Sequence, residues 1–214
     1  MGKNEGITKE LVKVVGKAGG YEALTEVTDR ILDGALEDGV LKEIPIVRAV
    51  VGLVRAGLGV GEVIFMRKLR AFLEPAKTIP QEKRDKFIAD MEKDPDLMEK
   101  VGTSLFVLLD RLEDLEKPVL LGRVFGAYLR AEITFEVFQR MARVIDRCFI
   151  EDLWIWVFEP DRADKSGVGA LDLMSCGVIE SYVVGSESLG RGHHKWTDFG
   201  RQFAKLVVEP GRLK

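Results

Sequence analysis

Apolar residues recur with helical spacing along most of the first three quarters of the chain. The pattern predicts helices over residues 8–18, 21–38, 96–116, 119–131 and 135–156, with a further helix between Pro80 and Asp94. Gly39 is a suitable C-terminal cap and Thr134 a suitable N-terminal cap. Because the connections are short, the helices are expected to pack antiparallel to their neighbours. The sequence therefore predicts a mainly α fold, with a multi-helix domain over residues 1–158.

The composition changes abruptly at residues 159–169, where proline, glycine, serine and charged residues gather. This composition predicts a linker. Beyond it, residues 170–176 suit a short helix, 178–184 a strand and 193–196 a returning strand. Thr197 is expected to cap a last helix. Residues 170–214 are thus predicted to form a small α+β module.

This module resembles the distal half of a winged-helix domain. The resemblance covers residues 168–208 and is carried by the glycine-rich tip between two strands, followed by Trp196-Thr197-Asp198-Phe199-Gly200. In that family the helix before the wing reads the major groove, but the helix over 170–176 offers no Arg, Lys, Asn or Gln to a base edge. Many winged-helix modules serve as protein-interaction elements, so the resemblance also implies that role.

The predicted wing contains four residues with basic or imidazole side chains, namely Arg191, His193, His194 and Lys195. Such a patch suits contact with phosphate without base specificity, and an ordinary solvated hairpin is the alternative. His193 and His194 are adjacent in a predicted strand, where successive side chains point to opposite faces. They are therefore not expected to form a chelating pair.

Residues 44–66 form the most unusual stretch, with fifteen apolar residues and four glycines among twenty-three. Arg48, Arg55 and Glu62 are its only charged residues, and their spacing of seven places them on one stripe of a helix. We favour a buried helix in which this stripe is a buried polar seam, broken near Gly57–Gly61 into helices over 45–56 and 62–73. Membrane insertion and phosphate binding by the glycines are the alternatives. Each charge near a bilayer centre costs about 2.5–3.5 kcal/mol or more.

Composition narrows the class of protein further. The chain has 214 residues, 46% of them hydrophobic and 31% charged, with a net charge of −3, which excludes disordered, collagen-like and disulfide-stapled classes. The N-terminus lacks the pattern of a secretory signal, so a cytoplasmic location is expected. Cys148 and Cys176 are far apart in apolar contexts and are predicted to be buried, reduced thiols. The helical series otherwise resembles bacterial or prophage-borne helical proteins without an assigned activity.

No motif for a nucleophile, a metal or a cofactor stands out, so we expect a non-enzymatic interaction or regulatory protein without a cofactor. The helix end Leu153–Phe158 is apolar on every side. It offers Trp154, Trp156 and Phe158, together with the wing, as candidate contacts for a protein partner or for self-association. A membrane-active protein using residues 44–66 and a weak nucleic-acid binder using the wing are the alternatives.

Overall fold

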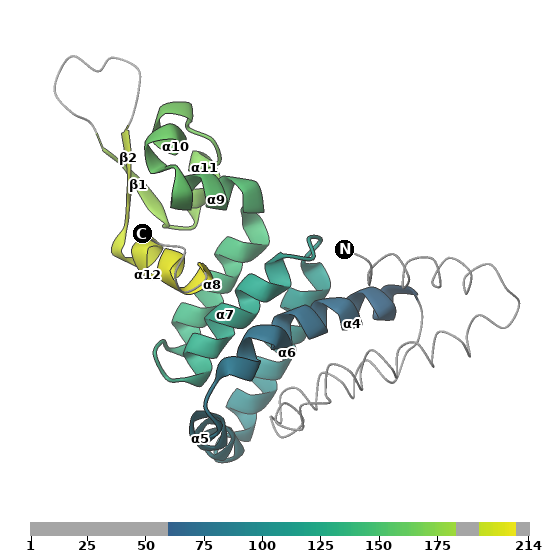
Figure 1. The fold of residues 1–214 in the computed structure, drawn as a ribbon. Coiled ribbons are helices and arrows are strands. Elements are labelled where there is room, and N and C mark those ends of the chain that lie inside the picture. The colour runs from purple at the N-terminus through teal and green to yellow at the C-terminus, as the bar shows by residue number, and fades with distance from the viewer. Residues whose placement is uncertain (1–59, 183–192, 209–214) are drawn as a thin grey trace, which may run out of the picture. The chain divides into compact units, whose positions relative to one another are not determined.

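The computed structural model describes residues 60–182 and 193–208 of the chain (Figure 1). Within these residues the protein is mainly helical, with one two-stranded antiparallel sheet near the C-terminus. This confirms the predicted fold class, a mainly α protein with a small C-terminal α+β part. The predicted helices 8–18 and 21–38 lie outside the described residues.

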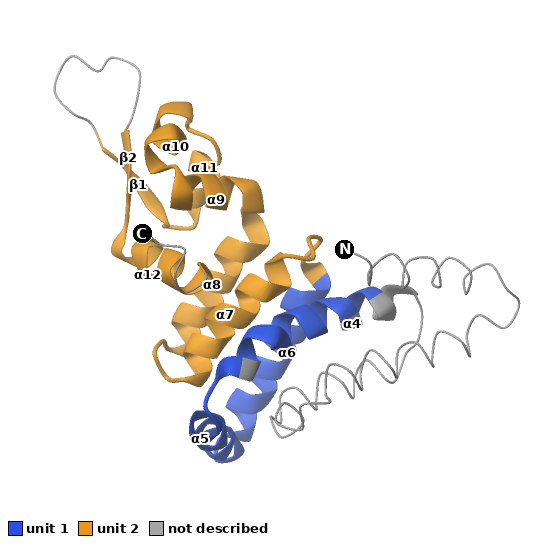
Figure 2. Ribbon diagram, in the orientation of Figure 1, with its two compact units in different colours: residues 1–110 blue, residues 111–214 orange. Residues whose placement is uncertain are grey.

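The chain divides into two compact units, residues 1–110 and residues 111–214 (Figure 2). The first is described from residue 60 onward and the second with the gaps given above. The predicted helical domain ends at residue 158 and the predicted C-terminal module begins at residue 170, and both positions lie within the second unit. The division at those limits stays a prediction about which segments fold independently.

The described part of unit 1 consists of helices joined by short turns, namely α4 (Val60–Leu73), the 3-10 helix η2 (Glu74–Thr78), α5 (Gln81–Glu92) and α6 (Pro95–Arg111). Helix α4 matches the helix predicted after the glycine cluster, and Glu62 lies in its first turn. Arg48 and Arg55 lie outside the described residues, so the predicted polar seam stays a prediction. In the part of the chain that the structure describes, no helix has the length and apolar character needed to cross a membrane.

Helices α4 and α6 are joined by an aromatic contact and a polar one. The rings of Phe65 and Phe106 lie 5.0 Å apart between centroids. Lys68 is a buried residue, and its ammonium group donates a hydrogen bond to the carbonyl oxygen of Asp110, 2.8 Å away. A cation at this position satisfies a carbonyl in the last turn of α6 and opposes the negative end of the helix dipole.

Unit 2 contains α7 (Lys117–Leu129), α8 (Phe135–Arg147), α9 (Ile150–Phe158), α10 (Pro160–Ser166), α11 (Ala170–Ser175), β1 (Ile179–Tyr182), β2 (His193–Trp196) and α12 (Asp198–Val207). Helix α7 packs against both α8 and α12, and it is buried along most of its length. Phe125 of α7 meets Phe138 of α8 edge to face at 5.6 Å. Thr134 caps α8 as predicted, because its side chain accepts the N–H of Val137.

The predicted helix over 135–156 is two helices in the structure. Cys148 and Phe149 both adopt extended backbone, with ψ of 145° and 139°, and this corner separates α8 from α9. The apolar spacing continues across the corner, so periodicity alone does not reveal it. A second difference lies at the predicted helix 96–116. This helix ends at Arg111, and residues 112–116 form an irregular segment before α7.

The segment 159–169, predicted to be a linker, forms helix α10 over most of its length. Pro160 occupies the first helical position, and Gly167 ends the helix with a φ of 65°. Proline in a first turn and glycine after a last turn are boundary signals of a helix. The composition therefore marked the two ends of a short helix, and the helix between them was missed.

The C-terminal elements follow the prediction closely. Strands β1 and β2 pair antiparallel from Ile179 opposite Trp196 to Tyr182 opposite His193. Thr197 caps α12, accepting the N–H of Gly200 at 2.9 Å and donating its hydroxyl to the carbonyl oxygen of Gly177 at 2.7 Å. These contacts join the start of α12 to the residues that precede β1.

Gly200 is required by the close approach of α12 to the residue before β1. A Cβ atom at this position would overlap the carbonyl oxygen of Val178 and come within 2.9 Å of the Trp196 ring. The threonine and the glycine of Trp196-Thr197-Asp198-Phe199-Gly200 therefore have separate structural roles. The threonine caps the helix, and the glycine allows the helix to pack against the backbone.

Candidate functional site

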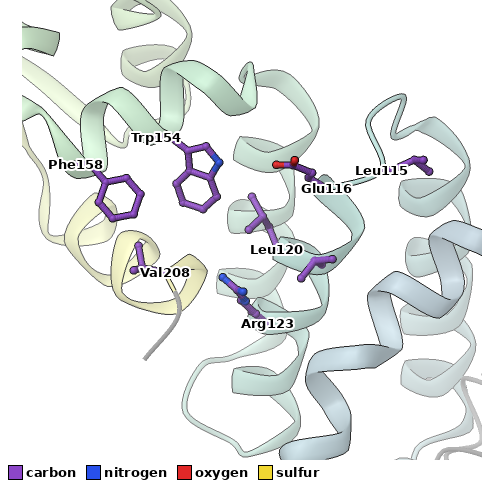
Figure 3. A pocket seen from close by; sticks show the side chains of 8 residues that line it. Leu115, Glu116, Leu120, Arg123, Trp154, Phe158 and Val208 are labelled. Atoms are coloured by element: carbon purple, nitrogen blue, oxygen red, sulfur yellow. The ribbon is translucent and has the colours of Figure 1, made fainter. Parts of the chain in front are cut away.

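Unit 2 contains an open pocket of about 260 Å³ (Figure 3). Its walls come from the turn before α7, from α7, from α9 and from the residue after α12. The lining residues are Leu115, Glu116, Val119, Leu120, Arg123, Trp154, Phe158 and Val208. Segments that are distant in sequence thus build one depression, which six apolar residues and two charged residues line.

The α9 wall is set by helical spacing. Trp154 and Phe158 are four residues apart, so they lie on the same face of α9 one turn from each other, and their ring centroids are 5.7 Å apart. Phe158 is 44% exposed and Leu115, on the opposite side of the pocket, is 52% exposed. Large apolar side chains therefore stand in solvent at the edge of the pocket.

Two charged residues also line the pocket. Arg123 donates from Nη1 to the carbonyl oxygen of Val207, and this holds the last turn of α12 beside α7. An arginine at a helix C-terminus is favourable because the last carbonyls have no partner within the helix. Glu116 precedes α7, and its side chain is exposed, without a capping hydrogen bond to the helix.

Sequence reasoning found only part of this pocket. Trp154 and Phe158 were expected at a docking surface, and the structure places both of them in the pocket wall. The α7 residues and Val208 were not anticipated. They come from separate segments of the sequence, and the packing of α7 against α12 brings them together.

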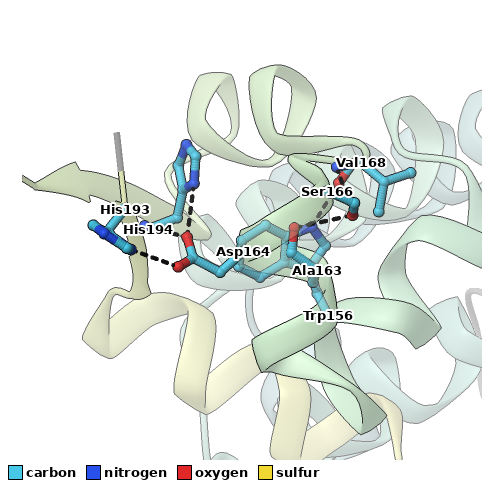
Figure 4. Close-up of polar contacts among 7 residues, drawn as sticks. All are labelled: Trp156, Ala163, Asp164, Ser166, Val168, His193 and His194. Carbon is cyan, nitrogen blue, oxygen red and sulfur yellow. Dashed lines mark hydrogen bonds and ion pairs between the residues drawn. The ribbon is translucent and has the colours of Figure 1, made fainter. Parts of the chain in front are cut away.

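Trp156 has a different position from its two neighbours. It is 1% exposed, and its indole N–H donates to the carbonyl oxygen of Val168 at 2.7 Å (Figure 4). The ring also meets His194 edge to face, with centroids 5.8 Å apart. Trp156 therefore belongs to the core of unit 2 and is not available to a partner.

A second polar arrangement forms where α10 meets β2. The carboxylate of Asp164 lies 2.9 Å from Nδ1 of His193 and 3.1 Å from Nδ1 of His194, and it accepts the backbone N–H of His194 at 2.6 Å (Figure 4). Burial raises the pKa of Asp164, but the hydrogen bonds from the two histidines outweigh it, so the pKa lies below its ordinary value. Asp164 therefore ties α10 to the returning strand.

The sequence did not reveal Asp164, because it lies in the segment predicted to be a linker. The two adjacent histidines were expected on opposite faces of the strand. Both rings nevertheless reach Asp164. Its Oδ2 contacts the ring of His193, and its Oδ1 contacts the ring of His194 and accepts the backbone N–H of His194. Within the described residues, no group of three or more His, Cys, Asp and Glu is arranged to hold a metal ion.

The other basic residues of the described hairpin and the start of α12 are also paired with acids. Lys195 lies 3.2 Å from Glu180, and Arg201 lies 2.6 Å from Asp198. Arg191 lies outside the described residues. The predicted basic wing is therefore largely neutralised by neighbouring carboxylates where the structure describes it.

The helix α11, which the winged-helix resemblance would place in a major groove, presents an apolar and acidic surface. Leu171 is 80% exposed, and Asp172 and Ser175 are its other exposed residues. No family model, curated protein or solved structure matches this chain. The chemistry of these surfaces is therefore the basis for inferring a function.

Proposed function

We propose that this protein is a non-enzymatic protein-interaction module, and that its pocket receives one bulky apolar side chain from a partner protein. The observation that carries this proposal is the pocket in unit 2, with Leu115 and Phe158 exposed on opposite sides and Trp154 beside them. Large apolar side chains held in solvent lose contact with water when a complementary surface covers them, and this favours association.

The size of the pocket supports a side chain as the occupant. Pockets for small molecules and cofactors commonly measure about 300–1,000 Å³. At about 260 Å³ and open to solvent, this pocket is smaller than that range. A single leucine, phenylalanine or tryptophan, presented by a short segment of another protein, fits it better than a nucleotide or a haem.

The types of residue in the pocket support the same occupant. Tryptophan and arginine are enriched among the residues that dominate binding energy at protein interfaces. Trp154 lies on one wall and Arg123 on another, where its hydrogen bond to Val207 holds α12 in place. The pocket therefore offers Trp154 as an apolar contact surface, and the hydrogen bond of Arg123 fixes the position of α12 beside it.

A nucleic acid is a weaker candidate for the partner. Phosphate binding by the wing would require Lys195 and Arg201 to exchange their carboxylate partners for phosphate. The exposed apolar and acidic residues of α11 also favour a protein surface over a base edge. A winged-helix-like module used for protein interaction, in a cytoplasmic protein, agrees with these features.

A peptide selection tests the proposal directly. A phage-displayed library of random peptides is selected against the intact protein, and enriched peptides are synthesised and titrated by fluorescence anisotropy. We expect a consensus with one obligatory bulky apolar residue. Phe158→Ala and Leu115→Ala should each weaken the peptide by about 10- to 30-fold, or about 1.4–2 kcal/mol.

Matched control variants come from exposed apolar residues away from the pocket lining. Phe149, 68% exposed, and Leu171 allow the same substitutions to alanine and should leave peptide affinity unchanged. The proposal is overturned if no peptide is enriched, or if the enriched peptides bind the two pocket variants as tightly as the wild type. Light scattering of the purified protein tests self-association. If the protein is a dimer and Phe158→Ala dissociates it, the occupant of the pocket is a second copy of this chain and not a foreign partner.

A further inference from the structure

The pocket of unit 2 has an acidic residue at one end and a basic residue farther along α7. Glu116 immediately precedes the helix and Arg123 lies within it, and both line the pocket. Because a helix rises about 1.5 Å per residue, the two residues are separated by about 10 Å along the axis of α7. Val119 and Leu120 lie between them in the pocket wall. The two ends of the pocket are therefore electrostatically different.

The carboxylate of Glu116 is available to a cation from outside the protein. Its side chain is exposed and makes no capping hydrogen bond to α7. In Figure 3 the carboxylate points toward the side of the pocket that Trp154 forms. Among the residues that the structure describes, none donates a hydrogen bond to this carboxylate or forms an ion pair with it. The acidic end of the pocket is thus exposed and unpaired there.

The basic residues that precede and follow this segment are directed toward the end of α8. The ammonium group of Lys117 donates to the carbonyl oxygen of Asp146 at 3.3 Å, and the Arg111 guanidinium lies 3.0 Å from the Asp146 carboxylate. Between these two cations, residues 112–116 include three acidic residues and no basic one. The irregular segment before α7 therefore gives this end of the pocket a negative charge that its neighbours in the sequence do not neutralise.

We propose that the partner segment carries a lysine or arginine close to its bulky apolar residue, and that this cation binds Glu116 while the apolar residue enters the pocket. The inference rests on the proposed function and specifies the chemistry of the partner. Opposite charges across an interface fix the orientation of binding and speed association. The guanidinium of Arg123 repels a cation at the other end, so the charge of the partner is placed at Glu116.

The dimensions of the pocket limit where the cation stands in the partner. Leu120 follows Glu116 by four residues, which is about 6 Å along α7. In an extended segment, two residues cover about 6.6 Å. In a helix, residues three or four apart have Cβ atoms about 5–6 Å from each other. We therefore expect the cation within about four residues of the apolar one in either conformation.

Selection from a biased peptide library tests the inference. Each phage-displayed peptide has leucine, phenylalanine or tryptophan at its centre and random residues on both sides, and the target is the intact wild-type protein. We expect lysine and arginine to be enriched, and aspartate and glutamate depleted, at one position near the centre. By fluorescence anisotropy, the synthetic consensus peptide should bind Glu116→Gln about 2- to 5-fold more weakly than the wild type, and Glu116→Lys about 10-fold more weakly or worse.

Charge reversal in both molecules identifies the contact. A consensus peptide with its cation replaced by glutamate should bind Glu116→Lys more tightly than it binds the wild type. Asp161→Lys is the matched control, because Asp161 is also an exposed acid in the sequence at the start of a helix, α10, and does not line the pocket. This control changes the net charge by the same amount and should leave the affinity for the consensus peptide unchanged.

The outcomes separate this inference from the proposed function. A consensus with an apolar centre and no preferred cation overturns the inference and leaves the apolar docking site in place, and this result needs no variant. Equal weakening by Glu116→Lys and Asp161→Lys overturns it as well. If no peptide is enriched, the proposed function and this inference are both wrong. A wild-type dimer that blocks peptide binding identifies a second copy as the occupant and overturns the cationic partner.

Discussion

Replacement of Gly200 by alanine is the sharpest test of how α12 packs in unit 2. The added Cβ atom would overlap the carbonyl oxygen of Val178 and lie 2.8 Å from its carbonyl carbon and 2.9 Å from the Trp196 ring. Real Cβ atoms essentially never come closer than 3.0 Å to another heavy atom. Two of these three neighbouring atoms belong to the backbone, so rotation of a side chain cannot relieve the overlap.

The size of the effect follows from two opposing contributions. Overpacking a closely fitted site commonly costs about 1–3 kcal/mol and sometimes more, and a backbone obstacle places this site at the upper end. Alanine in a helix is favoured over glycine by about 1 kcal/mol. Separating α12 from Val178 would also strain the hydrogen bond from Thr197 to the carbonyl of Gly177. We expect a net loss of about 2–3 kcal/mol in the free energy of unfolding.

Urea unfolding followed by circular dichroism and tryptophan fluorescence measures this loss. Gly167→Ala is the matched control, since a Cβ atom on Gly167 would meet nothing within 4 Å, although the residue has a φ of 65°. Left-handed backbone costs a non-glycine residue about 1–2 kcal/mol, so this control should be the milder variant. A Gly200→Ala protein within about 0.5 kcal/mol of the wild type would refute the close approach of α12.

Three further predictions concern the same unit. Trp156→Phe leaves the carbonyl of Val168 without its indole donor and should lower the free energy of unfolding, measured in urea, by about 1–3 kcal/mol. An unchanged urea midpoint would contradict the buried hydrogen bond. Because the pKa of Asp164 is lowered from 3.8, its carboxylate stabilises the folded state above about pH 4, and this is lost as the pH falls through the folded value. Asp164→Asn should therefore lower the melting temperature at pH 7, and the difference in melting temperature from the wild type should become smaller below about pH 4. A difference that does not change with pH would contradict this role of the Asp164 carboxylate. Thr197→Val should cost about 1–2 kcal/mol and Thr197→Ser much less, and equal losses would show that the hydroxyl is not the cap.

Local signals explain which parts of the fold were predictable. Thr134 and Thr197 both cap helices as expected, because a threonine before an amphipathic run satisfies a free N–H of the first turn. The first strand was recognised from its β-branched and aromatic residues, and the second was predicted as the return after a glycine-rich turn. Each of these predictions depends on residues within one short window of the sequence.

The parts that were missed depend on contacts between windows. Asp164 meets His193 and His194 across about thirty residues, and no local pattern links them. Of the three aromatic residues predicted as contacts, Trp156 is buried, whereas Trp154 and Phe158 line the pocket. An all-apolar helix end has no polar face in its sequence that would show which side is buried.

The corner at Cys148 and Phe149 has a consequence for how this chain tolerates insertions and deletions. Within a continuous helix, one inserted residue rotates everything beyond it by about 100° and misplaces every later side chain. Here the residues between α8 and α9 are extended, so a change of length at the corner leaves both helices intact. Natural variation in length is therefore expected to accumulate at this corner sooner than within α8 or α9.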